Sequence, residues 1–129
     1  MSVLKITSEN YKEEVLNSEK PVLIDFYADW CGPCRMMSPI IDEIAVQLGE
    51  KVKVGKVNVD ENQDLAMEYG VMSIPTIVIR KDGEISKTFV GVRDKNEILE
   101  ALKWDSVLLF HVSWQFGLKS QMLFSNRMN

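Results

Sequence analysis

The residues with the clearest chemical potential are two closely spaced cysteines: the chain reads Trp30, Cys31, Gly32, Pro33, Cys34. Pro33 favours the first turn of a helix, because its missing backbone N–H is not needed there. Cys31 is then expected at the helix N-terminus, where unpaired N–H groups and the helix dipole stabilise an anion. Its thiolate should therefore form at a lower pH than that of a free thiol, whose pKa is about 8.5.

The spacing of the two cysteines fits a reversible disulfide. Cys34 follows Cys31 by three residues and lies one turn away on the same helix face. A disulfide requires a Cα separation of about 4.4–6.8 Å, which this spacing supplies. One thiolate can attack a disulfide in another protein, and the second can resolve the mixed disulfide. The pattern predicts a redox-active dithiol.

Three other interpretations of the cysteine pair stay open. A structural disulfide that closes so short a loop would remove only about 2 kcal/mol of unfolded-state entropy. A zinc site needs four ligands, whereas the chain has two cysteines and one distant histidine. Two core cysteines brought together by chance fit poorly, because the glycine and proline between them indicate a tight exposed turn.

A second candidate for chemistry is Asp25, which interrupts the apolar run at residues 22–28. A run that is apolar on both faces is typical of a strand in the middle of a sheet. Burial there should raise the pKa of the Asp25 carboxyl, which could then accept a proton from Cys34 near neutral pH. The alternative is a structural aspartate whose hydrogen bonds are all satisfied.

The rest of the pattern supplies the elements that position these residues. The predicted strands are 3–6, 22–28, 52–59, 76–80 and 84–90, and the predicted helices run from 8 to about 17, 33 to 48, 60 to 70 and 94 to about 103. Gly49 should end the second helix, and Asp82-Gly83 predicts a hairpin. Asp60 and Gln63 have the spacing of a capping box. The order of elements predicts an α/β protein with a mixed sheet.

The Trp-Cys-Gly-Pro-Cys segment, placed after an apolar strand with an embedded Asp, resembles the active site of the thioredoxin family. The resemblance covers residues 1–103 and implies the thioredoxin fold, a central mixed β-sheet flanked by helices on both faces. It implies that Asp25 is the buried acid, Lys56 its partner, and Pro39 the proline that kinks the active-site helix. Residues 74–76 match the cis-proline loop that faces the cysteines.

The resemblance also implies a flat, apolar surface for an extended target peptide. Its expected members are Trp30, Gly32, Pro33, Ile74, Pro75, Val90 and Gly91. From the residues alone, Lys56 could equally be a charge on an edge strand. Pro75 would be a plain turn proline in most chains, since only about 5–6% of such bonds are cis. Tyr27 stands where many family members have tryptophan, and we expect it to alter fluorescence more than chemistry.

The function implied is that of a protein-disulfide reductase with Cys31, Cys34, Asp25 and Lys56 as catalytic residues and no bound cofactor. Disulfide-containing proteins would be its targets, and a thioredoxin reductase would restore the dithiol. The alternative is a non-catalytic thioredoxin-like subunit that binds or assembles partners through the same groove. The intact cysteine pair disfavours that alternative.

Composition limits the remaining possibilities. A net charge of -4 argues against binding to nucleic acid, which requires a basic face. No apolar stretch reaches the roughly 18 residues that a membrane-spanning helix needs. The N-terminal residues lack the apolar run of a signal peptide, so a cytoplasmic location is expected.

Residues 104–129 differ in composition from the rest of the chain. Their charged residues are Asp105, Lys119 and Arg127, and their aromatic residues are Trp104, Phe110, Trp114, Phe116 and Phe124. Apolar and polar residues alternate over 108–119, which predicts a one-sided strand or an interaction segment. A docking or membrane-surface role and read-through sequence without function both stay open. We expect an extension that is loosely held or self-associates, separate from a thioredoxin-like domain at 1–103.

Overall fold

The computed structural model describes residues 3–103, so the predictions for the extension 104–129 lie outside the described residues. The chain divides into two units, Met1–Lys95 and Asn96–Asn129. In the second unit, residues 96–103 belong to the last predicted helix, with Ile98 and Leu102 buried. None of the helices within residues 3–103 is long and apolar enough to cross a membrane.

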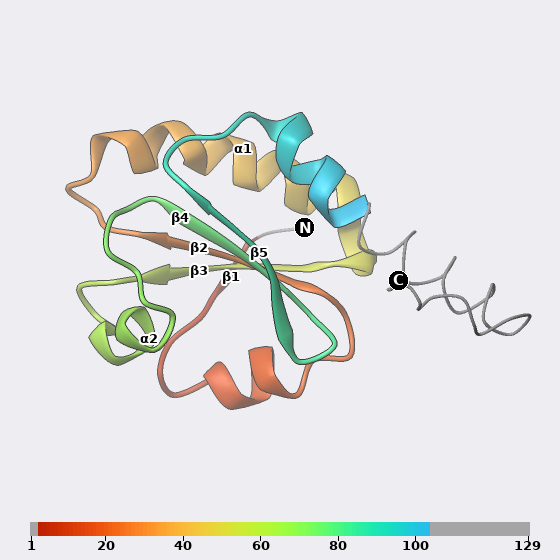
Figure 1. Cartoon of the computed structure of the whole chain (residues 1–129), viewed down its shortest axis with the longest axis horizontal. Helices are drawn as coiled ribbons and strands as arrows, with labels where there is room; N and C mark the ends of the chain where they lie inside the picture. Colours follow the sequence, from red (N-terminus) through yellow and green to blue (C-terminus); the bar gives the residue numbers. More distant parts are fainter. Residues whose placement is uncertain (1–2, 104–129) are drawn as a thin grey trace, which may run out of the picture. The chain divides into compact units, whose positions relative to one another are not determined.

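A five-stranded mixed sheet forms the centre of the first unit (Figure 1). Its strands are β1 (Leu4–Lys5), β2 (Val22–Tyr27), β3 (Lys53–Asn58), β4 (Thr76–Lys81) and β5 (Glu84–Val90), in the spatial order β1-β3-β2-β4-β5. β1, β3 and β2 are parallel, whereas β4 is antiparallel to both β2 and β5. Asp82 and Gly83 join β4 to β5 with φ of 55° and 82°, as the predicted hairpin turn requires. The predicted mixed sheet is confirmed.

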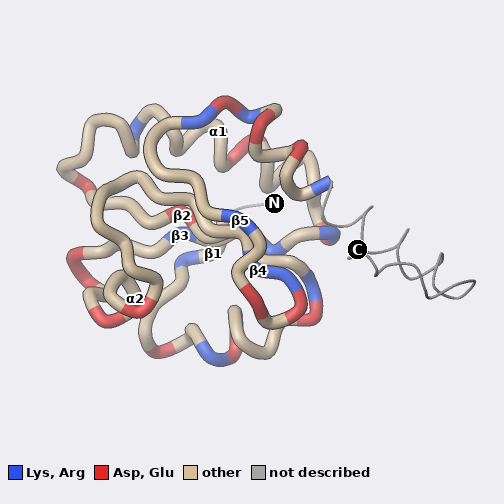
Figure 2. Tube along the Cα trace, in the orientation of Figure 1, with Lys and Arg blue, Asp and Glu red and all other residues tan. Residues whose placement is uncertain are grey.

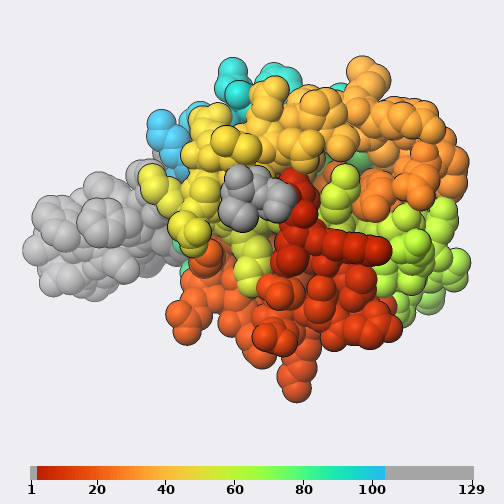
Figure 3. Space-filling model, turned by 180° about the vertical axis from the view of Figure 1, so that it is seen from behind, coloured from red at the N-terminus to blue at the C-terminus, as the bar shows by residue number. Residues whose placement is uncertain are grey.

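Helices cover both faces of this sheet (Figure 1). The long helix α1 (Gly32–Leu48) lies on one face and continues through Pro39, followed by the short 3-10 turn η2 (Gly49–Lys51). The helical turn η1 (Lys12–Leu16) and helix α2 (Gln63–Glu68) lie on the other. Seen from behind, the N-terminal segment (red) covers the lower part of the surface, and α1 (orange to yellow) covers the upper part (Figure 3). Two covered faces explain why β2 is apolar on both sides.

Strand β2 sends alternate side chains to these two faces. Ile24 and Phe26 join the apolar cluster that also contains Val15 and Leu65, from η1 and α2. Asp25 therefore points the other way, toward the face that α1 covers. The first five residues of β2 are buried, so this strand supplies both a core and the position of the acid.

Two predicted helices differ from the structure for one shared reason. Residues 8–10 form a turn instead of the start of a helix, and α2 begins after Asn62 without the predicted capping box. The backbone N–H of Ser8 donates to Asn62 Oδ1 at 2.9 Å, and the Ser8 hydroxyl donates to Asp64 at 2.6 Å. These bonds link two distant segments, whereas the sequence pattern predicted a helix that starts at residue 8 and a local capping box of Asp60 and Gln63.

Candidate active site

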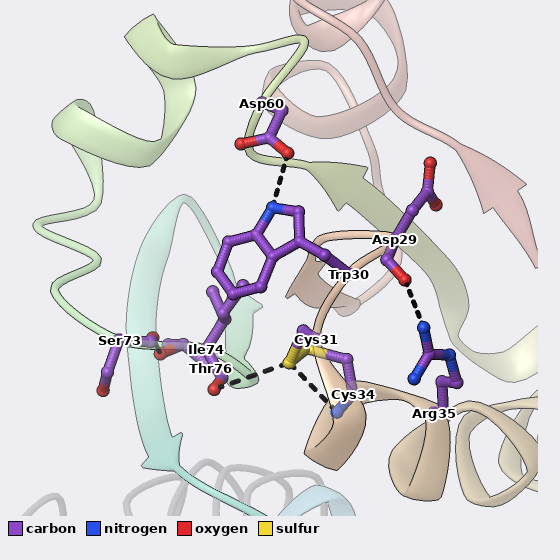
Figure 4. Close-up of a disulfide and its surroundings, with 9 residues drawn as sticks. All are labelled: Asp29, Trp30, Cys31, Cys34, Arg35, Asp60, Ser73, Ile74 and Thr76. Carbon is purple, nitrogen blue, oxygen red and sulfur yellow. Dashed lines mark hydrogen bonds between the residues drawn. A yellow bond between two sulfur atoms is a disulfide. The ribbon is translucent and has the colours of Figure 1, made fainter.

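Cys31 and Cys34 form a disulfide where the loop after β2 enters α1 (Figure 4). Their Cα atoms are 5.2 Å apart. Cys31 is the N-cap residue of α1, and its Sγ accepts a hydrogen bond from the backbone N–H of Cys34 at 3.1 Å. Because this bond and the positive end of the helix dipole favour a negative sulfur, the thiolate of the reduced protein is stabilised here.

The cysteines are less exposed than the predicted turn implied. Each is 4% exposed, whereas Gly32 and Pro33 between them are exposed. Cys31 Sγ lies 3.9 Å from the carbonyl oxygen of Ile74, within reach of a reduced thiol as donor. Cys31 thus lies beside Trp30 and Ile74 (Figure 4).

A groove of about 450 Å³ opens beside Cys31. Four of the residues predicted for the peptide surface line it: Trp30, Gly32, Pro33 and Ile74. Five further lining residues were not predicted from the sequence: Val59, Ala66, Val71, Met72 and Ser73. For Val71 and Met72 the signal was an apolar pair shortly before the predicted loop at 74–76, and Met72 is 94% exposed.

The remaining members of the predicted surface are Pro75, Val90 and Gly91, which lie at the cis-proline loop and at the end of β5. The Ile74-Pro75 peptide bond is cis, as the resemblance implied. Pro75 is buried, and its carbonyl accepts a hydrogen bond from Gly91 N–H at 2.8 Å. Gly91 has a φ of 93°, which an L side chain would strain, and Val90 beside it is half exposed. The bond between Pro75 and Gly91 ties the loop to the end of β5.

The rim of the groove is held by a charged partner. Trp30 Nε1 donates to Asp60 Oδ2 at 2.8 Å, which fixes the indole toward α2 (Figure 4). Acidic residues gather around α2 (Figure 2): Asp60, Glu61, Asp64 and Glu68. Because a hydrogen bond to a carboxylate is stronger than one between neutral groups, the exposed indole keeps a defined orientation.

Asp25 lines a second, smaller cavity of about 200 Å³. The other lining residues are Tyr27, Ala28, Asp29, Cys34, Arg35, Ser38 and Lys56. Burial raises the pKa of Asp25 from 3.8 to about 7, while the charge of Lys56 lowers it and Asp42 raises it further. Within the described residues, Asp25 Oδ1 has no hydrogen-bond partner. This differs from the fully satisfied structural aspartate considered from the sequence.

Lys56 lies directly beside Asp25 in the sheet. Their Cα atoms are partners in the parallel register of β2 and β3. Because β3 lies between β1 and β2, Lys56 is not a charge on an edge strand. Its ammonium nitrogen is 4.6 Å from the centroid of the Tyr27 ring. The structure thus brings Asp25, Lys56 and Cys34 to one cavity.

A metal site finds no support in the part of the chain that the structure describes, where no three His, Cys, Asp or Glu side chains cluster suitably for a metal ion. A disulfide at a helix N-terminus, between a peptide-sized groove and a buried acid, instead defines a thiol-disulfide oxidoreductase.

Comparison with known proteins identifies the family. The family model of thioredoxin matches residues 2–104. A thioredoxin of Rickettsia felis is 53% identical over 95 residues, which cover 74% of this chain and 90% of that protein. Thioredoxin 1 of Synechococcus elongatus is 52% identical over 97 residues, covering 75% and 91%. A thioredoxin of Pyropia yezoensis is 48% identical over 102 residues, covering 79% and 95%. The chain belongs to the thioredoxin family.

Membership confirms the expected fold and activity. The chain is a protein-disulfide reductase whose redox-active pair is Cys31 and Cys34. Its partners are disulfide-containing proteins and a thioredoxin reductase. These findings favour the enzyme over the non-catalytic binding subunit.

The raised pKa of Asp25 predicts a stability that depends on pH. The folded protein holds an extra proton between the unfolded value of 3.8 and the folded value of about 7, so its stability falls as pH rises through this window. We expect Asp25→Asn to be more stable than the wild type at pH 8, by at most about 4 kcal/mol, and nearly equal to it at pH 4. Urea unfolding of both oxidised proteins across this range measures the difference.

The exposed Asp82→Asn variant is the control for loss of one carboxylate at the surface. Equal stability of wild type and Asp25→Asn at pH 8 would contradict a desolvated Asp25.

Proposed function

We propose that Cys31 is the nucleophile of the reductase and Cys34 the resolving thiol. The observation that carries this assignment is that the two sulfurs belong to different cavities. Cys31 lines the groove in which a target peptide can lie, whereas Cys34 lines the cavity of Asp25. The hydrogen bond from Cys34 N–H to Cys31 Sγ supports a stabilised thiolate at Cys31.

The proposed reaction begins with the reduced protein. The Cys31 thiolate attacks one sulfur of the target disulfide, so a bond forms between Cys31 and the target, and the other target sulfur leaves as a thiolate that takes up a proton. Cys34 then loses its proton and attacks Cys31 Sγ. The second target sulfur leaves with a proton, and the Cys31–Cys34 disulfide remains. Overall, two electrons pass from the cysteine pair to the target. Of the two protons that the target takes up, one comes from the Cys34 thiol and the other from solvent.

Asp25 is proposed as the base that accepts the proton of Cys34. A base is most effective when its pKa is close to the working pH, and burial raises the pKa of Asp25 to about 7. The shared cavity of about 200 Å³ has room for water, so the proton can pass directly or through one molecule. Lys56 is proposed to moderate this base, because its charge favours the carboxylate.

A target segment is proposed to lie extended in the groove. Trp30, Gly32, Pro33 and Ile74 would supply apolar contacts, and the exposed Met72 would extend them. The loop at Pro75, tied to Gly91, would offer its backbone to the target chain. Apolar contact and backbone hydrogen bonds carry little sequence preference, which suits a reductase with many targets.

We propose the cytoplasm as its compartment and a reductase as the source of electrons. A reducing environment keeps the dithiol available, and no cofactor of its own is required by the steps above. The family model ends at residue 104, which supports a thioredoxin-like domain at 1–103 and a separate extension at 104–129. We propose that this extension self-associates and has no part in disulfide exchange.

The roles of the cysteines predict distinct labelling and turnover. In the reduced protein at pH 7, iodoacetamide should modify Cys31 before Cys34, because only the Cys31 thiolate is stabilised. Cys34→Ser should still attack insulin but accumulate a mixed disulfide, with turnover reduced at least about 100-fold. Peptide mapping measures the order of labelling, and insulin turbidity measures the turnover. Cys31→Ser is the matched control and should accumulate no mixed disulfide with insulin. Faster labelling of Cys34 would reverse the assignment.

The role of Asp25 predicts a pH-dependent loss of rate. Asp25→Asn should slow insulin reduction about 10-fold or more at pH 7, because it removes the buried carboxyl beside Cys34 whose pKa is raised to about 7. The loss should shrink as pH rises, since hydroxide increasingly replaces the base. Rates at pH 6–9 measure the effect, and an unchanged rate at pH 7 would refute a catalytic Asp25.

The extension gives a third prediction. Deleting residues 105–129 should leave insulin reduction unchanged within about twofold and lower light scattering. The alternation over 108–119 predicts a strand with one apolar face, and such faces promote association. The full chain is the control at equal concentration. Loss of activity or of cooperative melting in the shortened chain would place the extension within the fold.

A further inference from the structure

Tyr27 occupies a position that the sequence analysis connected only with fluorescence. It follows Asp25 by two residues in β2, so both side chains point to the face covered by α1. Its ring packs against the cluster of Ala28, Cys31 and Cys34 and lines the cavity of Asp25. A side chain in this place can act on the proton acceptor without touching it.

The partner of the Tyr27 ring is the cation beside Asp25. Lys56 Nζ lies 4.6 Å from the ring centroid, inside the range of a cation–π interaction. Lysine has a long stem that explores many rotamers when exposed, and a contact at its end restricts them. The aromatic face therefore favours one position of the Lys56 ammonium, in contact with the ring.

Other charged and titratable groups face Asp25 from the elements packed against it. Helix α1 contributes Cys34, Arg35 and Asp42, and the preceding loop contributes Asp29. The Arg35 guanidinium donates to the Asp29 carbonyl at 3.0 Å. Across the sheet, β4 places the apolar Ile77 opposite Asp25. Lys56 is the group whose charge opposes the effect of burial on Asp25.

We propose that Tyr27 is a positioning residue of the reductase: its ring holds the Lys56 ammonium in the Asp25 cavity and thereby sets the pH at which the base becomes available. The inference rests on the proposed role of Asp25. Tyr27 acts through Lys56, because a cation fixed beside a carboxylate stabilises it more than a cation that swings into water.

The proposal predicts the direction of the change when the ring is lost. Without the ring, Lys56 moves toward solvent, its attraction for the carboxylate weakens, and the protonation midpoint of Asp25 rises by about half a pH unit. Water entering the space left by the ring would have the opposite effect, because hydration stabilises the carboxylate. The sign of the shift therefore separates the two causes.

The experiment titrates the Asp25 carboxyl by ¹³C NMR in the oxidised protein, where neither cysteine titrates. Tyr27→Leu should raise the midpoint, and the matched control Tyr27→Phe, which keeps the ring, should leave it unchanged. Lys56→Met should raise it at least as far, and adding Tyr27→Leu to Lys56→Met should raise it no further. The pH–rate profile of insulin reduction should move with the midpoint in each variant.

The proposal would be overturned if Tyr27→Leu left the protonation midpoint of Asp25 unchanged or lowered it. It would also be overturned if Tyr27→Leu raised the midpoint further in the Lys56→Met background, or if Tyr27→Phe raised it as well. If Tyr27→Leu fails to fold, the wild type still decides: the ε-methylene protons of Lys56 should resonate upfield of those of exposed lysines because of the ring current, and ordinary shifts would refute the contact. The NMR titration needs no turnover. Failure of Asp25 as the catalytic base would instead appear as an unchanged rate in Asp25→Asn.

Discussion

Burial of β2 between β3 and β4 is the constraint on which both the core and the chemistry depend. One face of this strand packs Ile24 and Phe26 against η1 and α2, and its other face carries Asp25 under α1. Withdrawing a carboxylate from water costs free energy that hydrogen bonds normally offset, and Asp25 Oδ1 has no such partner within the described residues. The desolvated Asp25 carboxylate therefore destabilises the folded protein at neutral pH, and the apolar packing of the same strand offsets this cost.

The end of β2 then separates the two sulfurs by environment. The chain turns into α1 at once, so Cys31 caps the helix at the groove while Cys34 lies one turn deeper, beside the cavity of Asp25. The two sulfurs therefore have different surroundings. In the proposed mechanism, a thiolate stabilised by a backbone N–H and a thiol that must lose a proton to a base need different surroundings, and residues one helical turn apart provide them.

Electrostatics in the smaller cavity depend on geometry more than on composition. Asp25, Lys56 and Tyr27 come from two adjacent parallel strands, and the register that pairs Asp25 with Lys56 brings the three side chains to one face. In a partly buried cavity the interaction of two charges varies more strongly with their separation than it does in water. An aromatic ring that restrains a flexible cation can in this way adjust the pKa of a neighbouring carboxyl that it does not touch.

The sequence by itself determined the features that neighbouring residues control. Pro33 placed Cys31 at a helix start, Asp82-Gly83 specified the hairpin, and the apolar run around Asp25 marked a central strand. Each depends on local backbone preference or on burial of one continuous segment. Only the tertiary structure decided the start of α2, where Asn62 bonds Ser8, 54 residues away in the chain, and the contact of Lys56 with Tyr27. These contacts require two segments in a fixed register, and that register follows from packing of the whole sheet, because a side chain with several possible partners bonds the one that folding brings near.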